Sequence, residues 1–236
     1  MYYIFDDIKQ ITAISLIILC VGACSSHYDP WEGKNAEEIM NEGLTHMEWG
    51  NHESATEAFQ NVKDRYPYSR FAILAELKIA ESLFARSKFE DAYVEYDDYE
   101  RMHPKDKAIP YVIYQKAMCH FEQIETVDRE QFHAQKAKDE FERLINRFPE
   151  NIYAAKARKN FRECLISLAG AEISIGHFYY KMGKYTAAMN RYIYAIKNYP
   201  DMGQYNEALK YISMCRKNLS DKMESSSIPV NQDSES

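Results

Sequence analysis

The sequence predicts an all-α fold, a tetratricopeptide-like solenoid of about five helix pairs, and three observations support this prediction. An alanine is followed four residues later by an aromatic residue and eight residues after that by proline, and this happens four times. Small residues stand seven apart ahead of three of these sets, as in Gly43 with Gly50 and Gly176 with Gly183. Four of the seven prolines occupy the same phase, which is typical of stacked helix–turn–helix units. The sets are Ala55/Phe59/Pro67, Ala92/Tyr96/Pro104, Ala137/Phe141/Pro149 and Ala188/Tyr192/Pro200.

Each position in this pattern has a structural reason, which the first repeat illustrates. Gly43 lets the two helices of the pair cross closely, because a larger side chain would hold the backbones apart. Gly50 ends the first helix, where a left-handed backbone is least unfavourable for glycine. Ala55 and Phe59 lie one turn apart on the second helix and pack small against large. Pro67 then follows the second helix, which it cannot continue.

The later repeats are longer than the ideal tetratricopeptide period of about 34 residues, which the pattern otherwise resembles. Successive prolines of the pattern are 37, 45 and 51 residues apart. An insertion at Glu125–His133 lengthens the third repeat. The stretch Tyr153–Met182 has no proline and predicts either one long helix or two helices bent at Gly170. Gln204–Leu219 carries a single apolar stripe at helical spacing, which suits a terminal helix that covers the end of a solenoid.

The composition fits one extended core and does not favour a nucleic-acid partner. The chain has 236 residues, of which 46% are hydrophobic, and a net charge of −7. Lys and Arg are spread along the predicted helices, so the sequence shows no basic footprint for nucleic acid. Acidic pairs such as Asp97-Asp98 are interpreted as solvated helix faces. We expect a repeat domain at 36–219 and a disordered tail, rich in Ser, Asp, Glu and Asn, at 220–236.

The N-terminus indicates secretion and a lipid anchor. Ile11–Val21 is an apolar run of eleven residues, too short to span a bilayer and typical of a signal peptide. The following Val21-Gly22-Ala23-Cys24 resembles the lipobox of bacterial lipoproteins, in which the cysteine is acylated and becomes the mature N-terminus. We therefore predict a signal peptide at 1–23, a lipidated Cys24 and a short polar tether at 24–35. An ordinary signal peptide with an incidental cysteine, or a buried apolar segment, is the alternative.

The anchor also suggests a location. Ser25 follows the cysteine where a lipoprotein retained at the inner membrane usually has Asp, so the general rule points to the outer membrane. Two or more acyl chains on Cys24 would give stable anchoring.

Three further cysteines would remain in the mature chain, namely Cys119, Cys164 and Cys215. They have no spacing typical of a metal site or a redox motif, so we interpret them as buried helical residues that act as small hydrophobes. Three thiols cannot all pair. A disulfide between two of them is left open.

No set of catalytic residues is evident. The seven histidines have no partners at ligand spacing, and the repeat position of His46 and His120 is taken by Leu83 and Tyr179 elsewhere. A position that accepts such different side chains serves packing. Nucleotide-binding, hydrolase and metalloprotease motifs do not occur in the sequence. We therefore expect a protein that is not an enzyme, with no cofactor and no metal site.

A solenoid without catalytic residues usually serves as a binding surface for other proteins. Tyrosine and methionine on the first helix of each pair suit recognition of an extended or amphipathic peptide, because they adapt to it at modest entropic cost. Packing against the next repeat is the alternative for each of them. The peptide-groove candidates are Met40, Met47, Phe84, Tyr111, Tyr114 and Met118.

Several short segments occur in the same order as in a known family of lipoproteins. With the lipobox, the tether and the degenerate repeats, they resemble BamD (ComL), the lipoprotein family of the outer-membrane β-barrel assembly machinery. The similarity covers the mature chain to about Leu219. The segments are Arg65-Tyr66-Pro67-Tyr68, His103-Pro104, Pro110-Tyr111-Val112-Ile113-Tyr114, Asp128-Arg129, Asn190-Arg191 and Tyr199-Pro200-Asp201.

The resemblance implies a non-enzymatic protein on the periplasmic face of the outer membrane. It implies binding to the periplasmic domains of the barrel component BamA through the C-terminal repeats, where Asn190 and Arg191 lie. It also implies that the N-terminal repeats receive unfolded outer-membrane proteins, and it leaves contacts with other assembly lipoproteins open. The alternative is a periplasmic tetratricopeptide scaffold of the Tol-Pal type, which coordinates envelope constriction. Cys24 and the lack of heptads before Ala36 count against that alternative.

Overall fold

The computed structural model describes residues 29–227, and every regular element in that part of the chain is a helix. The predicted signal peptide, Cys24 and the residues after 227 lie outside the described part. The chain divides into two units, Met1–Asn35 and Ala36–Ser236, and the helices belong to the second. They are α2 (Ala36–Glu48), α3 (His52–Arg65), α4 (Ala72–Ala85), α5 (Phe89–Met102), α6 (Ile109–Phe121), α7 (Phe132–Arg147), α8 (Ile152–Lys181), α9 (Tyr185–Asn198) and α10 (Tyr205–Ser227).

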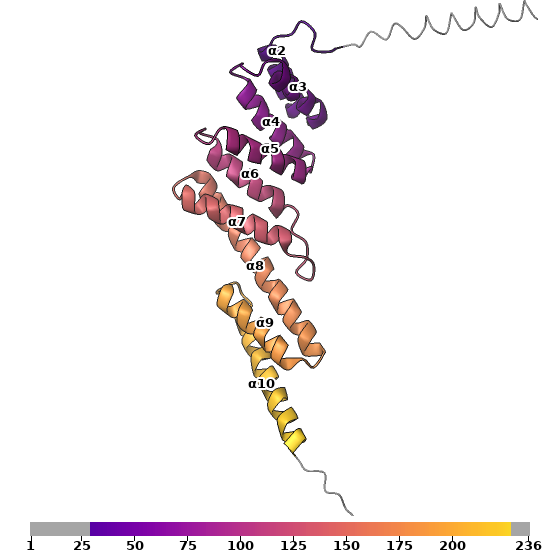
Figure 1. Ribbon diagram of the computed structural model, residues 1–236, viewed down its shortest axis with the longest axis vertical. Helices are drawn as coiled ribbons and strands as arrows, with labels where there is room; N and C mark the ends of the chain where they lie inside the picture. The colour runs from indigo at the N-terminus through magenta and orange to yellow at the C-terminus, as the bar shows by residue number, and fades with distance from the viewer. Residues whose placement is uncertain (1–28, 228–236) are drawn as a thin grey trace, which may run out of the picture. The chain divides into compact units, whose positions relative to one another are not determined.

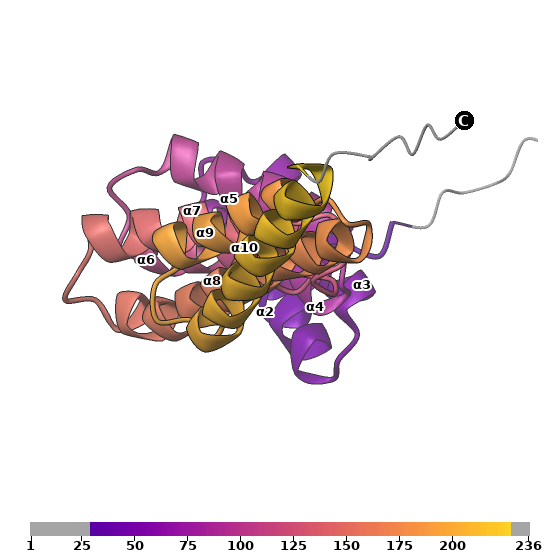
Figure 2. The same cartoon turned by 90° about the horizontal axis from the view of Figure 1, so that it is seen from below.

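The helices of the second unit stack in the order of the chain. Each helix packs mainly against its neighbours in sequence, and α6 also contacts α8 (Figure 1). Seen from below in Figure 2, α10 lies beside α9 at the end of the stack. This confirms the predicted all-α, tetratricopeptide-like solenoid. The helix pairs are α2 with α3, α4 with α5, α6 with α7 and the second half of α8 with α9, while the first half of α8 and α10 complete the stack.

The small–large pattern read from the sequence forms the core between paired helices. All four alanines and all four aromatic residues of the repeated sets are 0% exposed. In the first repeat, a Cβ on Gly43 would lie 2.6 Å from the ring of Phe59. In the last repeat, a Cβ on Gly176 would lie 2.5 Å from the ring of Tyr192. Since such separations are shorter than any real contact, only glycine lets the two helices approach this closely.

The turn between the helices of a pair also follows the predicted pattern. Gly50 and Gly183 end the first helices of their pairs with φ values of +74° and +70°. The equivalent Ser87 adopts the same left-handed conformation at +57°, which is strained for a residue with a Cβ. The turn geometry is therefore kept in the second repeat without glycine.

The structure shows the extent of two helices that the sequence left open or placed differently, α8 and α10. Of the alternatives for the long proline-free stretch, the single helix is confirmed, since α8 runs unbroken for 30 residues. Gly170 lies inside it, and a Cβ there would come within 2.9 Å of the side chain of Val127. Helix α10 extends to Ser227, past residue 219 where we expected a disordered tail to begin. Lys222, Met223 and Glu224 are good helix formers, which explains the extension.

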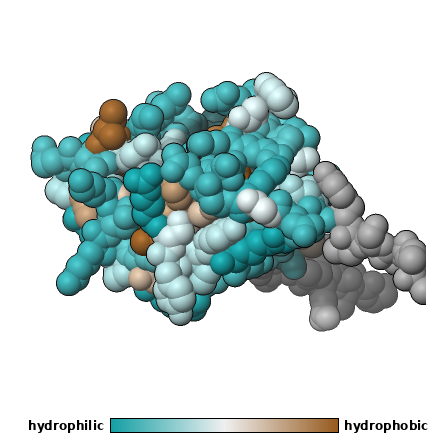
Figure 3. Space-filling view, turned by 90° about the horizontal axis from the view of Figure 1, so that it is seen from above, coloured by the Kyte–Doolittle hydropathy of each residue, from teal (hydrophilic) through white to brown (hydrophobic). Residues whose placement is uncertain are grey.

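Besides the packing of α2 on α3 around the buried Phe59, the described core of the second unit includes two apolar clusters. One apolar cluster extends from α4 to the first half of α8, and it includes Tyr96, Phe141 and Cys164. The other joins the second half of α8 to α9 and α10, and it includes Ile173 and Tyr192. Viewed from the α2 end, the surface is mostly hydrophilic, with apolar residues in small separate spots (Figure 3).

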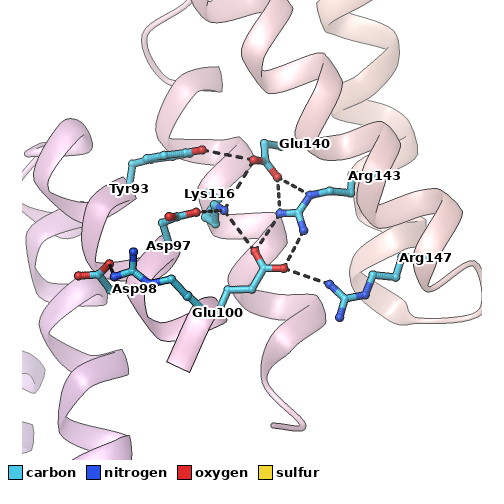
Figure 4. Close-up of polar contacts among 9 residues, drawn as sticks. Tyr93, Asp97, Asp98, Glu100, Lys116, Glu140, Arg143 and Arg147 are labelled. Carbon is cyan, nitrogen blue, oxygen red and sulfur yellow. Dashed lines mark hydrogen bonds and ion pairs between the residues drawn. The ribbon is translucent and has the colours of Figure 1, made fainter. Parts of the chain in front are cut away.

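A cluster of charged side chains joins α5, α6 and α7 (Figure 4). We call it the central ion cluster, and Lys116 lies at its centre with a side chain only 4% exposed. The Lys116 ammonium donates to Asp97 at 2.5 Å and to Glu100 at 3.2 Å. The Arg143 guanidinium binds both oxygens of Glu100, at 2.7 and 2.9 Å. The remaining members are Glu140, which accepts from Arg143, and Arg147, which donates to Glu100.

Burial and charge act against each other in this cluster. Burial by itself would raise the pKa of Glu100, but the hydrogen bonds from Arg143 and the charge of Lys116 lower it to about 2. Burial would likewise lower the pKa of Lys116, and the bond to Asp97 with the neighbouring carboxylates raises it instead. The charged forms of both side chains are therefore favoured. The Asp97 side chain is 47% exposed, as expected for a solvated face, and it also binds the buried lysine, which the sequence did not indicate.

Candidate partner-binding surface

An open groove of about 660 Å³ lies between α8 and the insertion loop, residues 122–131, which joins α6 to α7. Its apolar wall comes from α8, where Leu168 and Ala171 are buried and Ile175 and Phe178 are exposed. Phe178 is 60% exposed. Large apolar side chains held in a groove on a rigid helix are what a protein partner can cover. We refer to this feature as the α8 groove.

The insertion loop is held in place by its own hydrogen bonds and by contacts with α8. The Gln131 side-chain amide donates to the carbonyl oxygens of Thr126 and Arg129, at 3.2 and 3.1 Å. The same side chain accepts from the hydroxyl of Ser167 on α8, at 2.9 Å. Val127 fits against Gly170, where any larger residue would collide with it. The loop is therefore a defined wall of the groove.

Charged groups of both signs line the groove on the loop side. They include Asp128, Arg129 and Glu130. A hydrogen bond from Thr126 lowers the pKa of Asp128, so this side chain is a carboxylate at neutral pH. Arg129 is largely exposed and lies 3.6 Å from Glu125. The loop thus offers an anion and a cation side by side, which suits the polar rim of a protein interface.

The predicted pair on α9 lies next to this groove. Asn190 is exposed, as expected for one of two consecutive helical positions. The Arg191 side chain is 43% exposed, and its guanidinium is 3.1 Å from Glu172, which lines the α8 groove. Part of the Arg191 guanidinium is therefore engaged by Glu172 of the same chain. Its remaining N–H groups can donate to a second carboxylate or to backbone carbonyls.

The candidates on α2 and α4 do not share one site. Met40 is 1% exposed, so its side chain is part of the core in this conformation and cannot contact a peptide. Met47 is half-buried near the end of α2. Phe84, on α4, packs edge-to-face against Phe89 of α5, with ring centroids 5.3 Å apart.

The three candidates on α6 are brought together, but by packing against α8. Tyr111 and Tyr114 lie against the ring of Tyr153, at 5.2 and 5.8 Å. The Asn160 side-chain amide lies 3.3 Å from the Tyr114 hydroxyl and 3.0 Å from the sulfur of Met118. These side chains are half-buried. Their main contacts join α6 to α8, which corresponds to the packing alternative, and only their outer edges are accessible.

The chemistry available in the described chain is limited. Within residues 29–227, no three His, Cys, Asp or Glu side chains gather as metal ligands would, and no helix there is long and apolar enough to cross a membrane. Cys119, Cys164 and Cys215 are free and buried, as predicted. Burial raises the pKa of Cys119 and of Cys164 to about 12, so these groups remain unreactive thiols at neutral pH.

Comparison with known proteins shows the family of this chain. The family model YfiO, described as an outer membrane lipoprotein, matches residues 32–227. An "Outer membrane protein assembly factor BamD" from Rickettsia prowazekii is 31% identical over 202 residues, which cover 85% of this chain and 80% of that protein. Its namesake from Caulobacter vibrioides is 26% identical over 214 residues, covering 89% and 70%. A solved tetratricopeptide repeat protein from Parabacteroides merdae aligns with a TM-score of 0.43 at 14% identity, over 84% and 82%.

Proposed function

Because the chain belongs to the YfiO family of outer membrane lipoproteins, we propose that it is a non-enzymatic assembly factor for outer-membrane β-barrel proteins. The membership confirms the BamD resemblance predicted from the sequence. In this proposal Cys24 carries the lipid anchor, and the repeat domain works on the periplasmic face of the outer membrane. The partners are the periplasmic domains of a BamA-type barrel protein and unfolded outer-membrane proteins.

The observation that best supports the BamA contact is the α8 groove with Arg191 at its edge. The groove combines exposed Phe178 and Ile175 with charged groups of both signs, which is the composition of an interface with an apolar core and a polar rim. A guanidinium can bind a carboxylate through two parallel hydrogen bonds. We therefore assign the docking of the barrel component to this surface.

Unfolded substrates are assigned to the N-terminal repeats. Tyr68 and Trp49 are both strongly exposed there, and Tyr111 and Tyr114 offer accessible edges on α6. Aromatic side chains can bind many extended sequences because they pack against varied side chains and still donate or accept hydrogen bonds.

The first experiment identifies the partners. The lipid-anchored protein is crosslinked in outer membranes, purified, and its partners are identified by mass spectrometry. Recovery of a large β-barrel protein with periplasmic repeats supports the assembly function. Recovery of TolA or Pal instead would favour the Tol-Pal scaffold and overturn the proposal.

The anchor has its own test. Cys24→Ser removes the thiol that the acyl chain would modify, so we expect an unprocessed or a soluble periplasmic form. Membrane fractionation and the intact mass of the protein measure this. If Cys24→Ser leaves the membrane fractionation unchanged and does not change the intact mass beyond the substitution itself, lipidation at Cys24 is contradicted.

A charge reversal tests the proposed contact at Arg191. We expect Arg191→Glu to reduce recovery of the barrel component at physiological salt, with helicity and anchoring intact. The matched control is Arg101→Glu, which reverses an exposed arginine on α5 that also has an ion-pair partner, Asp98 of the same helix. This control should retain the complex.

A second variant separates binding from local structure. Combining Arg191→Glu with Glu172→Arg restores an ion pair within the chain but leaves the partner facing the wrong charge at position 191. Recovery that stays low in the double variant supports direct contact by Arg191. Full restoration would instead assign Arg191 to the internal pair and contradict the proposed contact.

A further inference from the structure

The C-terminal helices carry a charge opposite to that of the whole chain. Residues 178–219 contain seven Lys or Arg and two Asp or Glu, whereas the chain has a net charge of −7. Of these basic side chains, Arg191 pairs with Glu172. Lys197 and Arg216 are exposed, and no carboxylate of the described residues forms an ion pair with either. Their charge is therefore available to a second molecule.

These two residues flank an apolar groove of about 320 Å³ between α9 and α10. Its lining comprises Ile193, Ile196 and Lys197 from α9 and Leu209, Ile212, Ser213 and Arg216 from α10. Ile193 is 42% exposed and Leu209 is 44% exposed. Among residues 29–227, no acidic side chain lines this groove, and none of its lining residues also lines the α8 groove. We refer to it as the α9–α10 groove.

The order of side chains along the groove follows from the antiparallel packing of consecutive helices joined by a short turn. Lys197 is the penultimate residue of α9 and Leu209 lies in the second turn of α10, so both line the end of the groove nearest the turn that joins the two helices. Arg216 is seven residues further along α10, which is about 10 Å at 1.5 Å per residue. The groove therefore has a cation at each end and isoleucine and leucine side chains between them.

This arrangement has the shape of a missing helix. On α10, Leu209, Ile212, Ser213 and Arg216 stand at helical spacing on one face, and Ile193, Ile196 and Lys197 do the same on α9. In a solenoid, such paired stripes are normally covered by the next helix, and a terminal repeat has a polar outer face. The exposed isoleucine and leucine depart from that rule.

We propose that the α9–α10 groove binds an amphipathic helix of a partner protein, with acidic residues at both ends of its apolar stripe. A helix with acidic residues at positions i and i+7 and apolar residues at i+3 and i+4 matches the spacing from Lys197 to Arg216. Its apolar stripe would cover Ile193 and Leu209, and its carboxylates would meet the two unpaired cations. Charge complementarity selects an acidic helix over a basic one.

The test uses a synthetic probe and the purified mature chain. The probe is a fluorescein-labelled amphipathic peptide of three heptads, with glutamates at i and i+7 and leucines at i+3 and i+4 of one face. Its control carries lysine in place of the glutamates. Fluorescence anisotropy should show binding of the acidic peptide, weakened at high salt, and no binding of the basic peptide. Hydrogen exchange should show protection at 193–197 and 209–216.

Matched variants assign the binding to this groove. Lys197→Glu with Arg216→Glu should weaken binding of the acidic peptide at least about tenfold. Lys210→Glu with Lys217→Glu makes the same change in net charge at exposed positions of α10 outside the groove, and it should retain the affinity within about threefold. Because no residue is shared with the α8 groove, this result is independent of that obtained with Arg191→Glu.

Other outcomes would overturn the proposal. Equal losses in the two double variants would mean a nonspecific charge effect. Stronger binding to vesicles of phosphatidylglycerol than to the peptide, lost in Lys197→Glu with Arg216→Glu, would make the groove a lipid contact. Concentration-dependent self-association of the chain, abolished by the same variant, would make a second copy the occupant.

Discussion

The central helices α5–α7 and the C-terminal helices α8–α10 have the same small–large repeat packing but are connected in different ways. In the centre, five charged side chains form one network around a buried lysine (Figure 4). At the C-terminus, aromatic contacts predominate: Tyr211 packs against His177 at 4.3 Å and against Tyr192 at 5.4 Å. Cations there, such as Lys197 and Arg216, remain on the surface.

Charged side chains therefore have different roles in the two regions of this fold. In the central ion cluster the charges satisfy one another, which fixes α5, α6 and α7 and leaves little for a partner. At the C-terminus aromatic contacts join the helices, and Lys197 and Arg216 form no ion pair with the described residues, so these cations are available for binding. The comparison predicts that charge variants in the centre affect stability, whereas those at the C-terminus affect association.

The largest expected effect is that of Lys116→Met. Removing this buried cation leaves Asp97, Glu100 and Glu140 close together without their shared partner. Breaking a buried ion pair from one side typically costs about 3–5 kcal/mol, and we expect a decrease of that order in the free energy of unfolding. Urea denaturation followed by circular dichroism measures it. The control Lys159→Met removes an exposed lysine from α8 and should change the value by less than about 0.5 kcal/mol.

The free energy of unfolding, measured as a function of pH, should also reveal how much the central ion cluster contributes to stability. The pKa of Glu100 is about 2 in the folded chain and 4.5 ordinarily, so the carboxylate contributes stability that is fully present above about pH 4.5. That contribution is lost as the pH falls from about 4.5 towards 2, and it is on the order of 3 kcal/mol. Glu100→Gln should flatten the dependence of unfolding free energy on pH in this window. An unchanged slope would contradict the depressed pKa, and Glu163→Gln on the surface of α8 serves as the control.

Overpacking in the first helix pair, α2 with α3, and in the C-terminal region should lower the free energy of unfolding by similar amounts but should affect different helices. Gly43→Ala and Gly176→Ala each place a methyl group against an aromatic ring, and we expect each to lower the unfolding free energy by about 1–3 kcal/mol. Because a solenoid is coupled between neighbours, the Gly176 variant should lose hydrogen-exchange protection in α8–α10 first. Loss that spreads at once through α5–α7 would mean that the two regions unfold as one.

The repeats could be predicted because their signal is local and periodic. Ala188 and Tyr192 are four residues apart, so one helical turn brings them together whatever the rest of the chain does. The central ion cluster has no such signal, since Glu100 and Arg143 are 43 residues apart in sequence. The α8 groove was missed for the same reason. It depends on how the insertion loop packs against Gly170, although Asp128-Arg129 in that loop is one of the segments that carry the family resemblance.

The basic C-terminus was also missed, for a different reason. Charge was averaged over the chain, and the acidic excess of the earlier helices hid the surplus of Lys and Arg at 178–219. A count by repeat would have found it. Which of these cations pair, as Arg191 does, and which remain unpaired, as Arg216 does, depends on tertiary packing that the sequence pattern does not contain.

The smallest expected effect on stability is at Arg191 and Glu172. Since the arginine is 43% exposed, the coupling energy from Arg191→Ala, Glu172→Ala and the double variant should be roughly 0.2–1 kcal/mol. The same cycle for Arg143 and Glu100 should give a clearly larger value, because the guanidinium binds both oxygens of a carboxylate that also pairs with the buried Lys116. Equal coupling energies would remove the contrast between the two regions. A small value at Arg191 has a further use: loss of the barrel component in Arg191→Glu could then not result from unfolding of α9, and direct contact with the partner would be the remaining cause.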